Sequence, residues 1–304
     1  MKEPEGPSRR GPVEPDAAEL LRRVRLLELA ARRNAGGLVG GDWATAIPGQ
    51  GLLFHETRKY VAGESARRID WAISARVGEP HVRVDLEERQ REVYLAIDLS
   101  PSMHAGLGEK TKLELAVELA ATLAVSAVDS GDRLGWVFFA DRALAEERAA
   151  PGGRQLFRFL RSLLESTAAW TRPVAESDPR AAIHALERRR GRFVIFVISD
   201  FIDHDLPADL AYVRARHDLS LLHVYDPLEY EPSPRLVLSA VSPEGRAAPG
   251  SVAPGAAGTL EEMQAFLRRE AGRHRIACAS FSTSEAVAAG LDRFFHLKRR
   301  WRAR

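Results

Sequence analysis

The stretch Val93-Tyr-Leu-Ala-Ile-Asp98-Leu-Ser100-Pro-Ser102 leads from a continuous apolar segment into a turn with one carboxylate and two hydroxyls. A short apolar run bounded by polar residues is typical of a strand buried on both faces of a sheet. Ligands of open parallel sheets bind at the carboxyl ends of the strands. Asp98, Ser100 and Ser102 are therefore candidate binding residues, and their hard oxygen atoms favour a small divalent cation.

Further strands and helices are predicted around this segment. Apolar runs of the same kind cover residues 134–139, 193–198 and 219–225. Helical patterns cover residues 112–130, 153–165 and 179–190. A short strand near 236–241, a helix over 260–273, a strand over 276–281 and a helix over 284–295 are expected to complete the chain. The alternation predicts an α/β fold, a three-layer, doubly wound and mostly parallel sheet.

The sequence before residue 92 has a different character. Residues 1–15 read as a disordered leader, and residues 16–91 as an N-terminal extension of helical and β-rich structure. Leucines at helical spacing predict an amphipathic helix over 16–33, which ends before Gly36-Gly37. Alternation from His81 predicts a half-solvated edge strand. The sheet domain is expected to cover 92–297 and to be followed by a basic tail, 298–304.

Composition excludes several classes of protein. With 304 residues, 45% apolar, and 44 Lys+Arg against 42 Asp+Glu, the chain is an ordinary globular one with a net charge of +2. The single cysteine, Cys278, excludes a disulfide framework and predicts a reducing compartment, so we expect a cytoplasmic protein. No apolar stretch reaches the ~20 residues that a membrane span needs. The tail could meet nucleic acid, lipid or an acidic partner, but we expect a solvated tail and no nucleic-acid partner.

A second carboxylate follows another buried strand. In Phe196-Val-Ile-Ser199-Asp200, the apolar run again ends in a hydroxyl and an acid. In a doubly wound sheet the ends of the two strands can be neighbours, which would bring Asp98 and Asp200 together. For either acid alone, a helix cap or a turn residue is the favoured interpretation.

Together, Asp-x-Ser-x-Ser and the later strand that ends in Asp resemble a von Willebrand factor A-type domain with its metal-ion-dependent adhesion site. The resemblance implies Mg²⁺, with Mn²⁺ as the alternative, held by Asp98, Ser100, Ser102 and Asp200. It also implies an open coordination position that takes a carboxylate from a partner protein. The Thr of the family is matched by Ser177 in Glu176-Ser177-Asp178-Pro179, with Thr167 and Thr171 as rivals.

A longer series of motifs spans residues 51–295. It comprises Gly51-Leu-Leu-Phe54, Thr57-Arg58-Lys-Tyr60, Gly63-Glu64, Arg67-Arg68-Ile-Asp70-Trp71, Ser74-Ala-Arg76, Ser199-Asp200-Phe201 and Tyr225-Asp226-Pro227-Leu-Glu229. The series resembles domain of unknown function family 58. Members are usually found beside AAA+ ATPases of the MoxR type, which implies an adaptor or co-chaperone role with a client protein. Many members also carry a membrane hairpin before the signature, and no such segment is seen here.

The signature segment also has a physical interpretation. Its arginines alternate with acids, which predicts an ion-pair network that fixes the segment: Arg58, Arg67, Arg68 and Arg76 with Glu56, Glu64 and Asp70. The alternative is that these arginines face the acidic surface of a partner ATPase or bind its nucleotide. Trp71 is expected to be a core anchor.

Other chemistry has less support. No P-loop string occurs, so the chain is not itself a P-loop ATPase, and no histidine pair has zinc-site spacing. A metal-dependent phosphoesterase using Asp98 and Asp200 is one alternative, although Ser100 replaces the usual second acid and removes the obvious general acid. A metal-free scaffold is the other. We therefore expect a non-enzymatic, metal-dependent protein-binding module.

Overall fold

The computed structural model describes residues 17–36, 56–61, 69–84, 90–169, 178–189, 191–202, 209–230 and 259–302. The chain divides into two compact units, one formed by Met1–Ile47 with Glu92–Arg304 and the other by Pro48–Arg91. Each unit is described by itself. The predicted leader and the predicted strand near 236–241 lie outside the described residues.

The larger unit contains a six-stranded sheet with the order β5-β4-β3-β6-β7-β8. Every neighbouring pair is parallel except β4 and β5, which are antiparallel. The strands are β3 (Glu92–Asp98), β4 (Arg133–Phe139), β5 (Ala143–Ala150), β6 (Phe193–Ser199), β7 (Asp218–Tyr225) and β8 (Ala277–Ser282). The predicted mostly parallel sheet is therefore confirmed.

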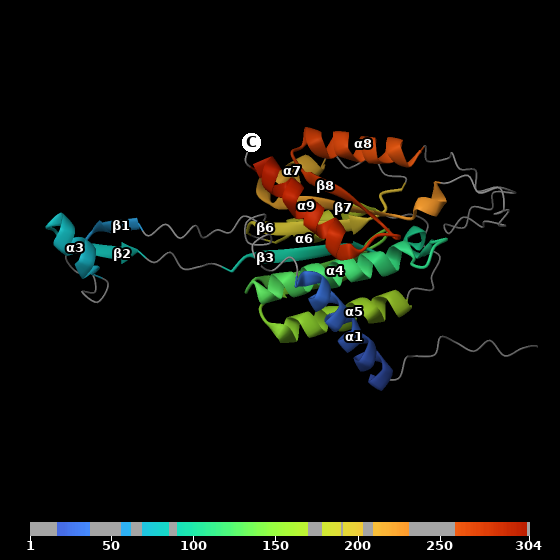
Figure 1. Cartoon of the computed structure of the whole chain (residues 1–304), viewed down its shortest axis with the longest axis horizontal. Helices are drawn as coiled ribbons and strands as arrows, with labels where there is room; N and C mark the ends of the chain where they lie inside the picture. Colours follow the sequence, from blue (N-terminus) through green and yellow to red (C-terminus); the bar gives the residue numbers. More distant parts are fainter. Residues whose placement is uncertain are drawn as a thin grey trace, which may run out of the picture. The chain divides into compact units, whose positions relative to one another are not determined.

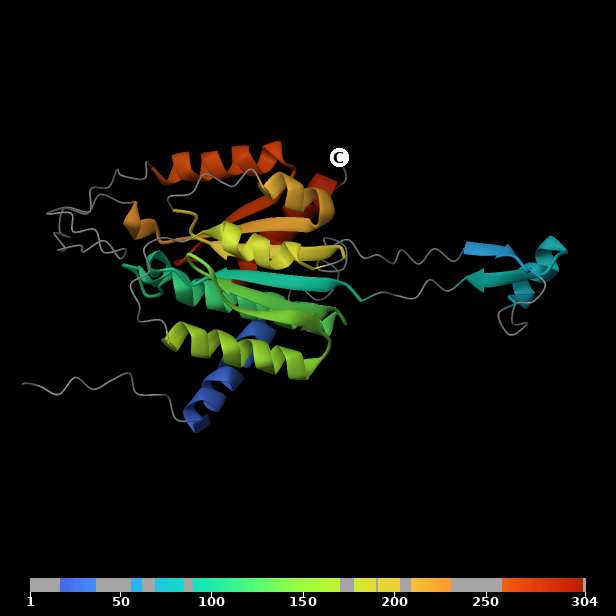
Figure 2. The same ribbon diagram turned by 180° about the vertical axis from the view of Figure 1, so that it is seen from behind.

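Helices cover both faces of this sheet (Figures 1 and 2). One face carries α1 (Ala17–Ala35), α4 (Lys112–Asp129), α5 (Gly153–Ala169) and α9 (Val287–Arg302). The other face carries α6 (Pro179–Glu187), α7 (Asp209–Arg216) and α8 (Leu260–Arg273). Successive side chains of a strand point to opposite faces, so Leu95 joins the first core and Ala96 the second. The three predicted layers are present.

Two elements of the larger unit differ from the sequence prediction. Residues 143–150 read Ala-Leu-Ala-Glu-Glu-Arg-Ala-Ala, a composition that favours helix, yet they form the edge strand β5. Pairing with β4 overrides this local preference. Helix α7 was not predicted, because its eight residues are too few to show a clear period.

Two of the predicted domain boundaries, one near each end of the chain, also need correction. Helix α1 was assigned with residues 16–91, but Val24 and Ala31 are buried in the first core of the larger unit. The basic tail predicted over residues 298–304 is wrong for its first five residues, because α9 continues to Arg302. Lys298 is 3% exposed and is part of the packed helix, where it pairs with Asp218.

The smaller unit holds a two-stranded antiparallel sheet of β1 (Glu56–Lys59) and β2 (His81–Val84) with helix α3 (Trp71–Val77). Asp70 caps α3 by accepting hydrogen bonds from the backbone N–H groups of Ala72 and Ile73. Trp71 is 69% exposed, so its prediction as a core anchor is wrong. A seven-residue helix and two short strands provide too little surface to bury an indole. Most of the predicted arginine network falls on residues or side chains outside the described part of the chain.

Candidate functional site

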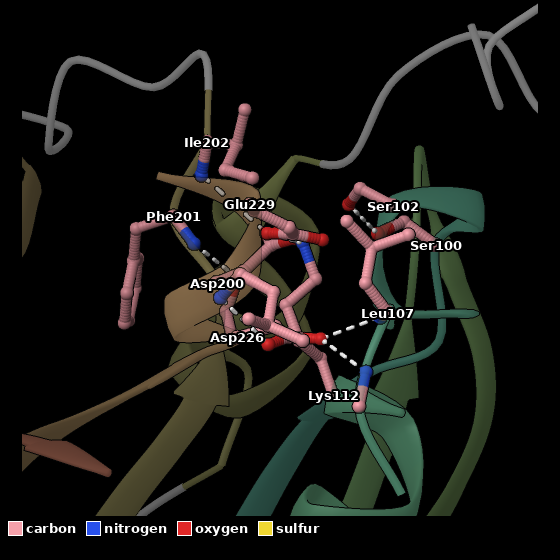
Figure 3. A network of polar contacts seen from close by, with 12 residues as sticks. Ser100, Ser102, Leu107, Lys112, Asp200, Phe201, Ile202, Asp226 and Glu229 are labelled. Carbon is pink, nitrogen blue, oxygen red and sulfur yellow. Dashed lines mark hydrogen bonds and ion pairs between the residues drawn. The ribbon is translucent and has the colours of Figure 1, made fainter. Parts of the chain in front are cut away.

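The two predicted acids lie at neighbouring strand ends. Strands β3 and β6 are parallel neighbours, with Ile97 opposite Ile198. Asp98 is the last residue of β3, and Asp200 directly follows β6. The sequence prediction that these two strand ends meet is confirmed, and Figure 3 shows the polar side chains that gather at this edge.

The carboxylate of Asp98 is fully buried and held from two sides. Its Oδ1 accepts a hydrogen bond from the backbone N–H of Ser100 at 2.8 Å. Its Oδ2 accepts a hydrogen bond from the hydroxyl of Ser199 at 2.6 Å. Ser199 Oγ in turn accepts from the backbone N–H of Phe201 at 3.0 Å. Both oxygens of Asp98 are therefore fixed in direction, which leaves the group poorly placed to act as a nucleophile.

Two serine hydroxyls lie beside Asp98. Ser100 precedes a short 3₁₀ helix, Pro101–His104, that contains Ser102. The Oγ atoms of Ser100 and Ser102 are 3.1 Å apart and both side chains are buried. Neighbouring oxygen ligands of an octahedral Mg²⁺ are about 2.9 Å apart, because each lies about 2.1 Å from the ion. The hydroxyl pair thus has the spacing of two adjacent metal ligands.

A buried lysine faces Asp200. Lys112 is the first residue of α4 and is 1% exposed. Its Nζ donates a hydrogen bond to Glu229 Oε2 at 2.9 Å and forms an ion pair with Asp200 Oδ2 at 3.0 Å. A cation is unfavourable at the positive end of a helix, so these two acids offset both the helix dipole and the burial.

The protonation of this cluster follows from burial and charge. Burial lowers the pKa of Lys112, but Asp200 and Glu229 outweigh it and raise that pKa above its usual value. Burial raises the pKa of Glu229, against the opposing effect of Lys112. Lys112 is therefore a permanent cation at neutral pH.

Asp226 ties two loops of the site together. It follows β7 and is 1% exposed. Its Oδ2 accepts from the backbone N–H groups of Leu107 at 2.6 Å and Gly108 at 3.2 Å. Its Oδ1 accepts from the backbone N–H of Leu228 at 3.0 Å. The short 3₁₀ helix Pro227–Glu229 is thereby held beside the loop that follows Ser102, as Figure 3 shows.

Two buried aromatic rings, those of Phe201 and His223, lie on another side of Asp200. Phe201 is buried and has a φ of 49°, a left-handed conformation that costs a non-glycine residue on the order of 1 kcal/mol. His223 is also buried, donates to or accepts from Ser280 Oγ at 3.0 Å, and stacks on Tyr225. Burial lowers the pKa of His223 to about 4, so the ring is neutral at pH 7. This environment strengthens charge interactions at Asp200.

The structure brings together four of the five predicted metal residues: Asp98, Ser100, Ser102 and Asp200. The fifth, Ser177, and its rival Thr171 lie outside the described residues. Thr167 is part of α5, where its hydroxyl donates to the carbonyl of Leu164. Among the described residues, no three His, Cys, Asp or Glu side chains form a metal-binding cluster, so a metal here would depend on the hydroxyl pair. The hydroxyl spacing fits Mg²⁺, whereas Asp200 already faces an ammonium.

Sequence reasoning gave no role to four residues of the site, which are Lys112, Ser199, Asp226 and Glu229. Ser199 and Asp226 end or follow buried strands, and the rule that pointed to Asp98 applies to them equally. Lys112 carries no such signal, because a lysine at the start of an amphipathic helix is ordinarily solvated.

The fold and the site together define a three-layer α/β domain with a carboxylate and hydroxyl site at the carboxyl edge of its sheet. Residues 56–237 match the family described as protein of unknown function DUF58, and the chain belongs to this family. The uncharacterized proteins Rv1480 of Mycobacterium tuberculosis and Mb1516 of Mycobacterium bovis are each 34% identical to it over 220 residues. The match covers 71% of this chain and 68% of each relative.

Solved structures with a similar fold include von Willebrand factor A-type proteins. An aerotolerance-related membrane protein from Bacteroides fragilis is 21% identical, with a TM-score of 0.47, over 68% of this chain and 99% of that one. A von Willebrand factor type A protein from Catenulispora acidiphila is 13% identical, with a TM-score of 0.39, over 70% of this chain and 42% of that one. With TM-scores below 0.5, these likenesses carry no conclusion about this chain. In the described part of this chain, no helix is long and apolar enough to cross a membrane.

Proposed function

We propose that this protein is a non-enzymatic, metal-dependent protein-binding module. Asp98, Ser100, Ser102 and Asp200, with Ser177 as a fifth ligand, would hold Mg²⁺ or Mn²⁺ at the carboxyl edge of the sheet. The observation that carries the proposal is the buried hydroxyl pair of Ser100 and Ser102, 3.1 Å apart and next to a fixed carboxylate. The bound cation supplies a positive charge that takes a carboxylate from a client protein.

The partner follows from the family resemblance. We propose that the module acts as an adaptor or co-chaperone of a MoxR-type AAA+ ATPase and presents the client to it during assembly or remodelling of protein complexes. Its placement in the cytoplasm belongs to the same proposal and rests on the single cysteine.

Calorimetric titration of Mg²⁺ and Mn²⁺ tests the metal. The wild-type protein is compared with Asp98→Ala and with a matched control, Asp129→Ala, which removes an acid at the far end of α4 that pairs with Arg32. Saturable binding that Asp98→Ala loses and Asp129→Ala keeps would support the proposal. Equal binding by all three proteins would exclude Asp98 as a site residue.

Affinity capture tests the partner. The immobilised wild-type protein should retain a purified MoxR-type ATPase in Mg²⁺, and EDTA or Asp98→Ala should reduce the retained amount. Retention that neither change affects would show that the site is not where the partner is bound.

The ion pair of Lys112 with Asp200 favours a second candidate, a metal-free scaffold, because the acid already has a cation. Stability measurements separate the two candidates. A site that binds metal in the native state raises the unfolding temperature as Mg²⁺ is added, whereas a metal-free scaffold shows no site-specific rise. A phosphoesterase would instead show turnover of generic phosphate esters that Asp98→Ala abolishes.

A further inference from the structure

Two lysines are buried in the described part of the chain, Lys112 and Lys298. Lys112 is the one that lies at the candidate site. Its side chain extends from α4 towards Asp200 and Glu229, with Ser100 and Ser102 on the facing side (Figure 3). Any divalent cation held by the hydroxyl pair and Asp200 would therefore lie close to the ammonium group of Lys112, which already pairs with Asp200.

The contacts of Lys112 with its two acids are unequal. The ammonium donates a well-formed hydrogen bond to Glu229 Oε2 at 2.9 Å. Its 3.0 Å contact with Asp200 Oδ2 is an ion pair without well-formed hydrogen-bond geometry, and that buried oxygen has no other donor among the described residues. Asp200 Oδ2 is thus the less satisfied of the two acceptors. A buried carboxylate oxygen in that condition gains more from a new cation than one with a complete set of hydrogen bonds.

We propose that Lys112 is a built-in competitor of the divalent cation at Asp200 and thereby sets how tightly the site binds metal. This inference rests on the proposed metal-binding function. Metal binding requires Asp200 to exchange the ammonium for the metal, and Lys112 keeps Glu229 as its partner. The repulsion between the ammonium and the metal weakens the site, so that a client carboxylate is needed to complete a tight complex.

Replacing Lys112 by methionine tests the competition directly. Methionine preserves the length of the side chain and removes the charge. We expect Lys112→Met to bind Mg²⁺ about tenfold more tightly than wild type in a calorimetric titration, since a like charge next to the ion has been removed. Lys110→Met is the matched control. It removes the same charge from a half-exposed lysine that lies two residues before Lys112 and pairs with Glu118. Its affinity should change by less than about twofold, because exposed charges are screened.

The outcomes separate this inference from the proposed function. The competition is supported if Lys112→Met binds Mg²⁺ more tightly than wild type and if adding Asp98→Ala abolishes that binding. The same result supports it when wild-type binding is too weak to measure. Equal affinity of Lys112→Met and wild type, with loss in Asp98→Ala, overturns the competition and leaves the metal-binding function intact. Absence of Mg²⁺ binding in every variant overturns both. An equal gain in Lys110→Met would reduce the effect to general electrostatics and also overturn the inference.

A second variant guards against a failure to fold. Lys112→Met leaves the buried Asp200 and the partly buried Glu229 without their cation, whereas Lys112→Met/Glu229→Gln removes one of those charges. Unfolding curves with and without Mg²⁺ give an independent readout. The rise in unfolding temperature with Mg²⁺ should be larger in the double variant than in wild type, and an equal rise would contradict the competition.

Discussion

The two buried lysines of the larger unit lie at opposite ends of the sheet and have different surroundings. Lys112 faces two carboxylates at the carboxyl edge, next to Ser100 and Ser102. Lys298 lies at the amino end of β7, where it donates to Ser220 Oγ at 2.8 Å and pairs with Asp218 at 3.2 Å. Its ammonium also lies over the rings of Phe196 and Phe294.

This difference distinguishes a structural cation from the cation at the candidate site. The described surroundings of Lys298 include the acid Asp218, a hydroxyl and two aromatic faces, and the pairing attaches the end of α9 to the sheet. Around Lys112, acids outnumber the cation and two hydroxyls lie nearby, so the region has an excess of oxygen ligands.

The largest expected effect is on the structural cation. Lys298→Met should lower the free energy of unfolding by about 4 kcal/mol, because Asp218 is left buried without its partner. Urea denaturation measures the change, and Mg²⁺ should not restore it. A loss below about 1 kcal/mol, the value of a surface ion pair, would show that Lys298 is not a structural clamp.

Low pH should destabilise the protein through two histidines that lie near the two lysines. Burial lowers the pKa of His223, close to Asp200, and that of His217, beside Asp218, to about 4. The unfolded chain takes up these protons near pH 6.5, so stability is complete above that pH and is lost as the pH falls towards 4. His223→Gln should reduce this loss by on the order of 3 kcal/mol in urea titrations at pH 7 and pH 4. If His223→Gln loses as much stability as wild type between pH 7 and pH 4, His223 takes up its proton as readily in the native state as in the unfolded chain.

A smaller effect is expected from the link between the two loops at the carboxyl edge. Asp226→Ala removes the acceptor of three backbone N–H groups, those of Leu107, Gly108 and Leu228. The free energy of unfolding should fall by about 2 kcal/mol. Hydrogen exchange should speed up at these amides and leave the amino end, around Ser220, unaffected. A uniform increase along the chain would contradict a local role.

The smallest effect is expected for a half-exposed lysine. Lys110 is paired with Glu118 at 2.8 Å, and its side chain is 41% exposed. Lys110→Met should change the free energy of unfolding by no more than about 0.5 kcal/mol, because solvent and salt screen such pairs. The same urea titration measures it. If Lys110→Met lowered the free energy of unfolding as much as Lys298→Met, burial would not explain the difference between the two lysines.

Sequence patterns predicted the layers of the fold because the central strands are continuous apolar runs and the helices have clear periods. They also placed Asp98 and Asp200 at adjacent strand ends, since both follow such runs. They did not find Lys112, because burial of a lysine depends on partners from other elements, here Glu229 after β7. The last turns of α9, beyond residue 295, were missed for a related reason. Lys298 reads as a solvated residue until its ion pair with Asp218 on β7 is known.

Strand β5 has a consequence for the order in which the protein folds. Its residues favour helix, so this segment owes its extended form to partners elsewhere in the chain. They include β4, the Tyr94 hydroxyl, which accepts from the Ala149 N–H, and Gln155, whose side chain donates to the Arg148 carbonyl. A strand of this kind joins after its neighbour is in place. We expect substitutions along it to accelerate unfolding while they leave the refolding rate nearly unchanged, so that resistance to slow inactivation can be engineered there without disturbing early folding.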